Sequence, residues 1–259
     1  MREIRLFFTA LTFYTRLPGL RLADHSETGL NLATRYFPLV GIIVGCLVSA
    51  VFLVADRVLP TSIAVVISMG ATIWITGAFH EDGLADTCDG LGGGWSKEDV
   101  LRIMKDSRLG TYGAVGLVLA LLLKYSALLA VPVHLVPAAL ICGHAASRLV
   151  PVVVMSRLEY VREDETSKTR PVARGIGGWQ VVIAAVPGLL PLWLLEPLLW
   201  AALLPMAVTG AWLTRHCHRR LGGYTGDTLG ALQQVCELAF YLGVIALWTY
   251  TSSATLPSP

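Results

Sequence analysis

Long apolar runs separated by short polar stretches dominate the chain. Each run is close to the roughly 20 residues that a helix needs to cross a bilayer, so the pattern predicts an all-α, polytopic membrane helical bundle. Two of the runs are short and contain prolines, which also suits a kinked hairpin that does not fully cross. The seven predicted spans are residues 38–55, 61–79, 111–131, 135–155, 179–195, 197–213 and 229–250.

The composition supports this interpretation. Hydrophobic residues make up 54% of the chain and charged residues 15%, against about 25% in soluble domains. No low-complexity linker divides the sequence, which predicts a single membrane-embedded domain over residues 1–259. The scattered cysteines show no CxxC pair, so we expect reduced, apolar side chains rather than a disulfide or zinc framework.

Residues 1–37 form a polar and aromatic N-terminal segment. Arg2 and Arg5 stand among aromatic and leucine residues without an uninterrupted apolar core, which argues against a cleaved signal peptide. The segment suits a helix lying in the cytoplasmic interface. A short re-entrant or bundle-packed helix fits the same pattern.

The basic residues of the connections predict the orientation. The segments 1–37, 80–110, 156–178 and 214–228 hold most of the lysines and arginines, whereas Arg57 is the only basic residue in the connections of the other side. We therefore expect a cytoplasmic N-terminus, an external C-terminus and polar segments that share the cytoplasm. In a bacterium this corresponds to a multi-pass protein of the inner membrane.

The polar segment 80–110 contains the main candidate site. If residues 83–89 are helical, spacings of four and three place Asp82, Asp86 and Asp89 on one face. Three carboxylates so close together favour a bound cation, and an oxygen-only set favours Mg²⁺. Gly83 and Gly90 allow an anionic ligand to approach the backbone. The alternative is a polar helix end solvated at the membrane surface.

A second short helix is predicted after this motif. Ser96 and Asp99 have the spacing of a capping box, and Lys105 and Arg108 follow at the end of the helix. Because they lie near the Asp cluster, we expect these two cations to bind a pyrophosphate; the alternative is contact with lipid headgroups. Asp106 would complete the metal shell or orient Arg108.

Two further polar segments face the same side. The segment 156–178 suits a lid over an anionic substrate, with Lys168, Arg170 and Arg174, or a solvated loop. In the segment 219–228, Gly226 and Thr228 begin a helix whose free N–H groups suit phosphate. Asp227 caps that helix, binds metal or accepts the proton of an attacking hydroxyl. The run from His216 to His218 is a weak metal motif.

Three motifs together resemble the cobalamin synthase family: HEDGLADTCDG, IMKDSRLGTYG and GGYTGDTLGA. The resemblance covers most of the chain and departs from the family pattern at Glu81, where an apolar residue is favoured. It implies a Mg²⁺-dependent membrane enzyme that joins α-ribazole, or its 5′-phosphate, to adenosylcobinamide-GDP and releases GMP.

On this basis the expected roles can be assigned. Asp82, Asp86 and Asp89 bind Mg²⁺ and act in catalysis with Asp227 as the base, since His80 points away from the Asp face of an ideal helix. The phosphate-binding residues are Lys105, Arg108, Gly83, Gly226 and Thr228. The expected partners are these small-molecule substrates and the lipid bilayer, with no nucleic acid. A homo-oligomer or an association with other corrinoid enzymes is a further expectation.

Other functions make different demands on the sequence. Intramembrane prenyltransferases and CDP-alcohol phosphotransferases also cluster aspartates, but both predict a second paired Asp motif, and only Asp227 stands in the third segment. A cation transporter predicts acidic residues at mid-membrane depth in several helices, whereas most of them lie in the cytoplasmic connections here.

Two charges inside predicted spans need partners. Arg148 lies roughly 10 Å and Glu237 about 12 Å deep from the cytoplasmic side, at 1.5 Å per helical residue. An ionised side chain at such depth is seldom exposed to lipid. We therefore expect Arg148 and Glu237 to meet in the bundle interior, with Gln233 one turn away.

Overall fold

The structure is a computed structural model that describes residues 1–19, 23–24, 26–161 and 176–254. Within these ranges every regular element is a helix, as predicted. The elements are α1 (Arg2–Tyr14), α2 (Glu27–Ala33), η1 (Thr34–Tyr36), α3 (Phe37–Asp56), α4 (Thr61–Thr76), α5 (Phe79–Gly93), α6 (Lys97–Lys105), α7 (Thr111–Ala130), α8 (Val136–Met155), α9 (Gly178–Leu189), η3 (Leu190–Leu194), η4 (Pro197–Ala202), α10 (Leu203–Leu221) and α11 (Gly226–Ala254).

Several of these helices are long and apolar enough to cross a membrane. Five described segments meet this condition alone, and a sixth does so if α4 and α5, bent by 89°, form one broken span. The apolar segment Gly178–Leu194 is shorter. A membrane helical bundle is thus confirmed, while the predicted number of seven crossings stays a prediction. The five segments are Thr28–Asp56, Thr111–Ala130, Val136–Met155, Pro197–Leu221 and Gly226–Ser252.

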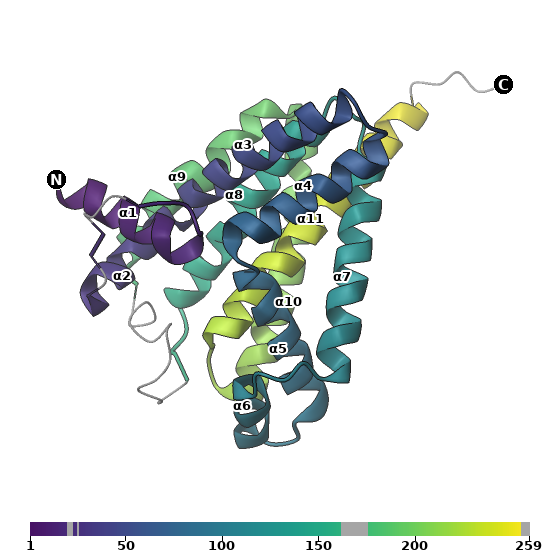
Figure 1. Cartoon of the computed structure of the whole chain (residues 1–259). Helices are drawn as coiled ribbons and strands as arrows, with labels where there is room; N and C mark the ends of the chain where they lie inside the picture. The colour runs from purple at the N-terminus through teal and green to yellow at the C-terminus, as the bar shows by residue number, and fades with distance from the viewer. Residues whose placement is uncertain (20–22, 25, 162–175, 255–259) are drawn as a thin grey trace.

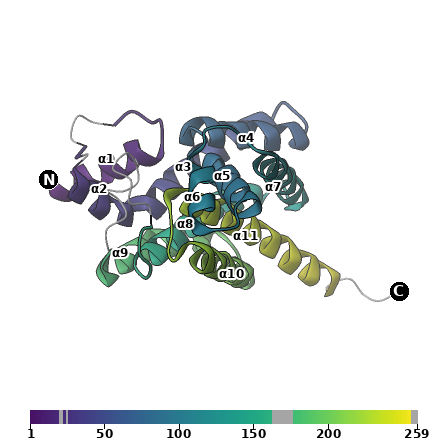
Figure 2. The ribbon, with the colours of Figure 1, turned by 90° about the horizontal axis from the view of Figure 1, so that it is seen from below.

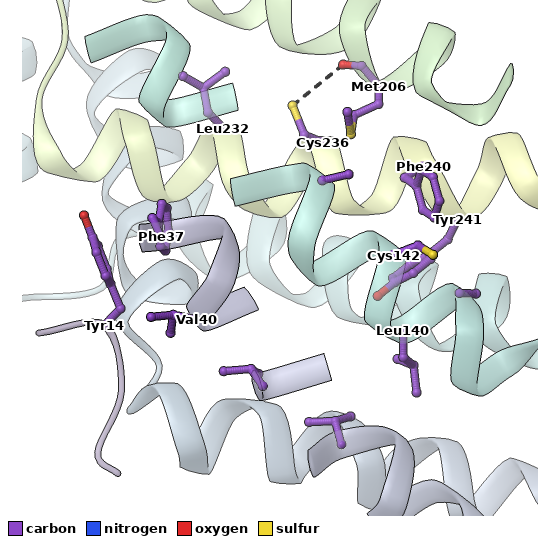
Figure 3. Close-up of a cluster of buried hydrophobic side chains, with 14 of the residues drawn as sticks. Tyr14, Phe37, Val40, Leu140, Cys142, Met206, Leu232, Cys236, Phe240 and Tyr241 are labelled. Atoms are coloured by element: carbon purple, nitrogen blue, oxygen red, sulfur yellow. Dashed lines mark hydrogen bonds between the residues drawn. The ribbon is translucent and has the colours of Figure 1, made fainter. Parts of the chain in front are cut away.

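Helix α11 is the central element of the bundle. It packs against α5, α7, α8, α10 and η4, while α3 lies against α8 and α4 (Figures 1 and 2). The buried side chains Leu232, Cys236 and Phe240 of α11 belong to the main hydrophobic core, part of which Figure 3 shows. The helix that begins at Gly226 is therefore fixed by neighbours on several sides.

Helix α1 is amphipathic and buries one of its faces. Leu6, Ala10 and Tyr14 are buried, and the Tyr14 ring stacks on Phe37 of α3 with centroids 4.0 Å apart. Helix α1 lies at one side of the bundle, beside α2 (Figure 1). The predicted N-terminal helix is present, and its inner face belongs to the bundle.

The bend between α4 and α5 directs the polar helix back into the protein. Gly77 and Ala78 both adopt the left-handed conformation, with φ of 67° and 58°. Their position is fixed from outside, because the Arg16 amide donates to the Ile75 carbonyl at 2.7 Å. A non-glycine residue with positive φ carries a local energetic cost, so packing must hold Ala78 in place. As a result, α5 descends from α4 beside α11 (Figure 1).

Candidate active site

The site forms where α5 meets the first turns of α11. A Cβ atom on Gly83 would lie 2.8 Å from the Asp227 carbonyl oxygen and 3.1 Å from its Cα atom. Gly230, one turn further along α11, also lies against α5, although less tightly, with its Cβ position 3.4 Å from the Gly83 Cα atom. Only glycine permits this backbone approach. The first and third polar motifs, distant in sequence, therefore lie side by side.

The three predicted metal ligands share helix α5 but have different surroundings. The sequence correctly predicted a helix across them, since α5 extends from Phe79 to Gly93. Asp82 is exposed, Asp86 is half-buried and Asp89 is buried. Across the described residues, no group of three or more His, Cys, Asp or Glu side chains is gathered closely enough to hold a metal ion. Asp82 and Asp86, one turn apart, remain the more accessible pair.

Asp89 binds the start of another helix. Its two carboxylate oxygens accept hydrogen bonds from the backbone amides of Gly110 and Gly113, both at 2.8 Å. These amides belong to the first turn of α7, where N–H groups have no partner within the helix. A carboxylate there satisfies both amides and interacts favourably with the helix dipole. The role of Asp89 in this structure is to cap α7 from a distance.

Helix α6 follows the Asp motif and is capped as the sequence predicted. The Ser96 hydroxyl accepts a hydrogen bond from the Asp99 amide at 3.1 Å. The helix packs closely on α5, because a Cβ atom on Gly90 would lie 2.6 Å from Met104 Cγ. The glycine thus serves helix packing, and Lys105 is exposed in the last turn of α6.

Asp106 orients Arg108. The Arg108 Nη2 atom lies 2.6 Å from Asp106 Oδ2, and Nε lies 3.0 Å from Oδ1. The hydrogen bonds from Arg108 lower the pKa of Asp106 from 3.8 to about 2, with a further contribution from the arginine charge. Asp106 is therefore ionised at neutral pH and holds the guanidinium, which is the second of the two predicted roles.

The N-terminus of α11 has its own capping box. The Thr228 amide donates to the Thr225 hydroxyl at 3.2 Å, and the Thr225 amide donates to the Thr228 hydroxyl at 2.9 Å. This reciprocal pair satisfies two amides that otherwise lack partners. The cap is therefore Thr225, and the expectation that Asp227 caps the helix is wrong. The Thr228 side chain belongs to the cap, and Gly226 and Asp227 are both half-buried.

Arg220 joins α10 to the end of α5, which sequence reasoning missed. Its Nη2 atom donates to the Gly94 carbonyl at 2.5 Å, and Nη1 lies 3.5 Å from the Leu91 carbonyl. Basic side chains are favourable at a helix C-terminus, where carbonyl groups lack partners. The run Gly92–Gly94 predicted the end of this helix, where unpaired carbonyl groups attract a basic side chain, and this was the signal in the sequence.

The second polar segment meets the third beside this site. Val161 donates to the Tyr224 carbonyl and Tyr224 donates to the Glu159 carbonyl, both at 3.0 Å. The predicted lid residues Lys168, Arg170 and Arg174 lie outside the described residues. The run at the end of α10 is divided: His216 stacks on Trp212, Cys217 is buried and His218 is exposed.

A buried polar cluster lies deeper in the bundle. The predicted direct pair of Arg148 and Glu237 is wrong, because the cation bound to Glu237 is Lys124 of α7, at 2.6 Å. His144 lies between the two predicted partners, with Nδ1 3.3 Å from Glu237 Oε2 and 3.0 Å from Arg148 Nη1. Gln233 donates to Glu237 at 2.6 Å, as its predicted position one turn away suggested.

Two residues next to the Asp motif point into the protein. His80 is buried and stacks parallel to Phe37, with centroids 5.5 Å apart and an interplanar angle of 6°. Glu81 is also buried and accepts a hydrogen bond from Gln234 of α11 at 3.0 Å. A glutamate is accommodated in this apolar surrounding because α11 provides an amide donor.

The donor chemistry of the exposed α5 face fits a hard divalent ion. Asp82 and Asp86 present only oxygen ligands, which Mg²⁺ prefers, and such a site typically keeps several waters alongside one or two carboxylates. Asp89 fits less well because both its oxygens already accept backbone hydrogen bonds. The metal assignment remains a prediction, and these contacts favour Asp82 and Asp86 as its ligands.

Comparison with known proteins finds close relatives along nearly the whole chain. Residues 6–245 match the family described as cobalamin-5-phosphate synthase. A Shewanella frigidimarina protein named adenosylcobinamide-GDP ribazoletransferase is 43% identical over 251 residues, covering 95% of this chain and 96% of that protein. A protein of the same name from Shewanella amazonensis is 45% identical over 254 residues, covering 96% and 97%. No solved structure matches the chain.

Proposed function

The chain belongs to the cobalamin-5-phosphate synthase family, and from this premise we propose how its residues carry out the reaction. It is a membrane transferase of cobalamin synthesis that joins adenosylcobinamide-GDP and α-ribazole, or α-ribazole 5′-phosphate, and releases GMP as the nucleotide loop is assembled. The rival activities, CDP-alcohol phosphotransfer and prenyl transfer, are not the ones that these relatives are named for.

The contact between Gly83 and Asp227 carries the proposed assignment of the site. In the transfer, the oxygen of a free ribose hydroxyl of the acceptor bonds to the phosphorus nearer to cobinamide, and the bond from that phosphorus to the GMP oxygen breaks. The attacking group is not the 5′-hydroxyl, because the alternative acceptor, α-ribazole 5′-phosphate, has none. Asp227, whose backbone packs against Gly83 of α5, accepts the hydroxyl proton as general base. Its position at the start of α11 orients the acceptor against the diphosphate.

Asp82 and Asp86 are the proposed ligands of Mg²⁺, because both are accessible and lie one turn apart on α5. When bound, the ion supplies positive charge that stabilises the diphosphate and the departing GMP. Asp89, committed to the first turn of α7, holds the neighbouring backbone in position. We therefore assign Asp89 a positioning role in the site.

The proposed phosphate contacts come from two elements. Lys105 and Arg108 extend from the end of α6, and Arg108 is held in a fixed orientation by Asp106. The second contact is made by the backbone amides of Gly226 and Asp227, which lie in the first turn of α11, where the helix dipole favours an anion. Gly83 contributes through packing, because the α11 backbone fills the space where its side chain would lie and is thereby held beside α5.

The proposed topology follows the distribution of basic residues. The chain crosses the bacterial inner membrane seven times, with the N-terminus and the site in the cytoplasm and the C-terminus outside. Both substrates are polar and soluble, which suits a site at the cytoplasmic surface. We further propose that the chain acts as a homo-oligomer or together with other corrinoid enzymes, which would keep large corrinoid intermediates near the membrane.

The experiment uses the purified protein in lipid nanodiscs. Incubation with adenosylcobinamide-GDP, α-ribazole and Mg²⁺ should yield GMP and a cobalamin in equal amounts, measured by chromatography. Omission of α-ribazole should abolish GMP release, and EDTA should stop the reaction until Mg²⁺ is restored in excess. Absence of both products from well-folded protein would contradict the proposed function, whereas activity that persists in EDTA would contradict only the metal.

A further inference from the structure

A cavity lined by aromatic rings lies beside the site, and none of the roles above accounts for it. Its enclosed space is small, about 30 Å³, which is room for one or two water molecules before any side chain moves. Gly226, Leu229 and Gly230 of α11 form one part of its wall. The rings come from five separate parts of the chain and belong to Phe13, Tyr14, Phe37, Phe79, Tyr160 and Tyr224.

His80 also lines this cavity, and its buried ring nitrogens lack hydrogen-bond partners among the described residues. Only 1% of the surface of His80 is exposed. A buried polar group without a partner costs free energy, so nearly all such groups in proteins are satisfied. Stacking on Phe37 fixes the plane of the imidazole. The structure thus presents an oriented hydrogen-bonding group inside an aromatic cavity.

The chemistry of the wall restricts what the cavity binds. The described residues that line it include no Asp, Glu, Lys or Arg, so a phosphate would be buried there without a compensating charge. Guanine carries a carbonyl and an amino group that need several polar partners. A flat, largely apolar heteroaromatic ring needs stacking surfaces and one partner for a ring nitrogen, which His80 provides.

We infer that this cavity holds the benzimidazole base of the acceptor nucleoside, with His80 donating a hydrogen bond to the free ring nitrogen of the base. The inference rests on the proposed function, since ribazole is the acceptor of the reaction. Gly226 lines the cavity and Asp227 is the next residue along α11. A heterocycle held here leaves its ribose at the start of α11, where the attacking hydroxyl meets Asp227, the proposed general base.

Entry of the ring requires movement of the cavity wall. The space is narrow, so a bicyclic ring bound in it turns at least one aromatic side chain outward. The edge-to-face contact of Tyr160 with Tyr224, with centroids 5.7 Å apart, lies at the end nearest the start of α11. His80 itself stays in place because it belongs to α5 and stacks on α3.

The test is a double comparison of protein and ligand. One ligand is α-ribazole, and the other is its analogue in which C–H replaces the free ring nitrogen, the corresponding dimethylindole nucleoside. Equilibrium dialysis with nanodisc-bound protein should give at least tenfold weaker binding of the analogue to the wild type. In His80→Phe, which keeps a flat ring without nitrogen, both ligands should bind equally and about as weakly as the analogue binds the wild type.

Matched controls separate this role from a structural one. His216→Phe removes another histidine stacked on an aromatic ring, Trp212, and should preserve the tenfold discrimination. In turnover, His80→Phe should raise the KM for α-ribazole at least tenfold while the KM for adenosylcobinamide-GDP changes by less than twofold. If His80→Phe does not fold, His80→Asn, which retains a donor, replaces it and should retain at least threefold discrimination.

Two results would overturn the inference. Equal binding of both ligands to the wild type would mean that His80 contacts only water. An undiminished tenfold discrimination in well-folded His80→Phe would place the nitrogen contact elsewhere. Both measurements are made without turnover, so they are separate from the proposed function, which fails only if the wild type forms no GMP and cobalamin.

Discussion

The carboxylate of Asp89 lies 2.8 Å from the backbone nitrogen of Gly113. With the equal contact to Gly110, it fixes the start of α7 to the last part of α5. The segment between Asp89 and Gly110, which includes α6 and its cations, therefore forms a loop whose two ends are held together by these hydrogen bonds. The last aspartate of a metal-like motif thus links two helices.

Replacing Asp89 should affect stability more than metal binding. In Asp89→Ala each buried amide that loses its acceptor costs about 1–3 kcal/mol, so the melting temperature of the nanodisc-bound protein should fall. Asp89→Asn, which keeps an acceptor oxygen, should recover part of the loss. The Mg²⁺ concentration for half-maximal activity should stay within threefold of wild type in the folded fraction. A tenfold rise in that concentration without loss of stability would show that Asp89 is a metal ligand.

Asp86→Ala should have the opposite profile. Loss of a charge that positions a metal at a transferring phosphate costs about 3 kcal/mol or more, which corresponds to at least a hundredfold lower kcat. The same result is expected for Asp82→Ala, with membrane insertion and melting temperature unchanged. Glu98→Ala, an exposed carboxylate of α6, is the control and should keep normal turnover. Near-normal activity of Asp86→Ala would remove this residue from the site.

Gly83→Ala tests the contact between α5 and α11. The new Cβ atom would lie 2.8 Å from the Asp227 carbonyl oxygen, so the two backbones must separate. Misplacement by about 1 Å can cost a hundredfold in rate, and overpacking typically costs about 1–3 kcal/mol of stability. Turnover should fall at least tenfold. The matched control is Gly70→Ala in α4, whose Cβ position has no neighbour within 4 Å and whose activity should be unchanged. Full activity of Gly83→Ala would show that the approach is not needed.

The positions of the helices were largely predictable, whereas the directions of polar side chains were not. Helices α7 and α8 lie within one residue of their predicted spans, because bilayer thickness and the apolar runs set their length. Asp89 has the spacing of a metal ligand, but its partners are 21 and 24 residues away and meet it only through tertiary packing. The pairing of Gly83 with Asp227 likewise depends on the packing of α5 on α11.

Lys124 shows a signal that was present in the sequence and overlooked. It is the only charged residue in the apolar run 111–131, and such a residue within a span ordinarily has a partner in the protein. Arg148 was predicted as the partner of Glu237 because the two residues lie at similar depths from the cytoplasmic surface. Depth alone does not define which helix faces meet, and α7 presents Lys124 to α11 while Arg148 turns to His144.

Breaking the pair of Lys124 and Glu237 should destabilise the bundle. Removal of one partner from a buried ion pair costs about 3–5 kcal/mol, because the remaining charge stays buried. Lys124→Met and Glu237→Gln should each lower the thermal stability, and the double variant should be more stable than Lys124→Met alone. Arg148→Met, combined with Lys124→Met, should show no such recovery. A double variant no better than the worse single variant would contradict the assignment.

The topology can be tested by labelling in sealed vesicles. In a variant without the native cysteines, Trp95→Cys should react from the cytoplasmic side, since Trp95 is 95% exposed between α5 and α6. Thr255→Cys, beyond the end of α11, should react only from the opposite side. Labelling of both positions by a membrane-impermeant maleimide from one side would contradict the seven-crossing arrangement.

The separation of Lys124 and Glu237 along the chain has a consequence for how the protein is made. Helix α7 leaves the ribosome before α8, α9 and α10, and its lysine enters the membrane while the glutamate of α11 is still to be translated. An ionised lysine exposed to lipid is costly, so α7 is fully stable in the membrane only once α11 supplies the glutamate. Integration is therefore completed by the C-terminal helix. Chains cut short before α11 would expose an uncompensated charge, which membrane quality control can recognise and degrade.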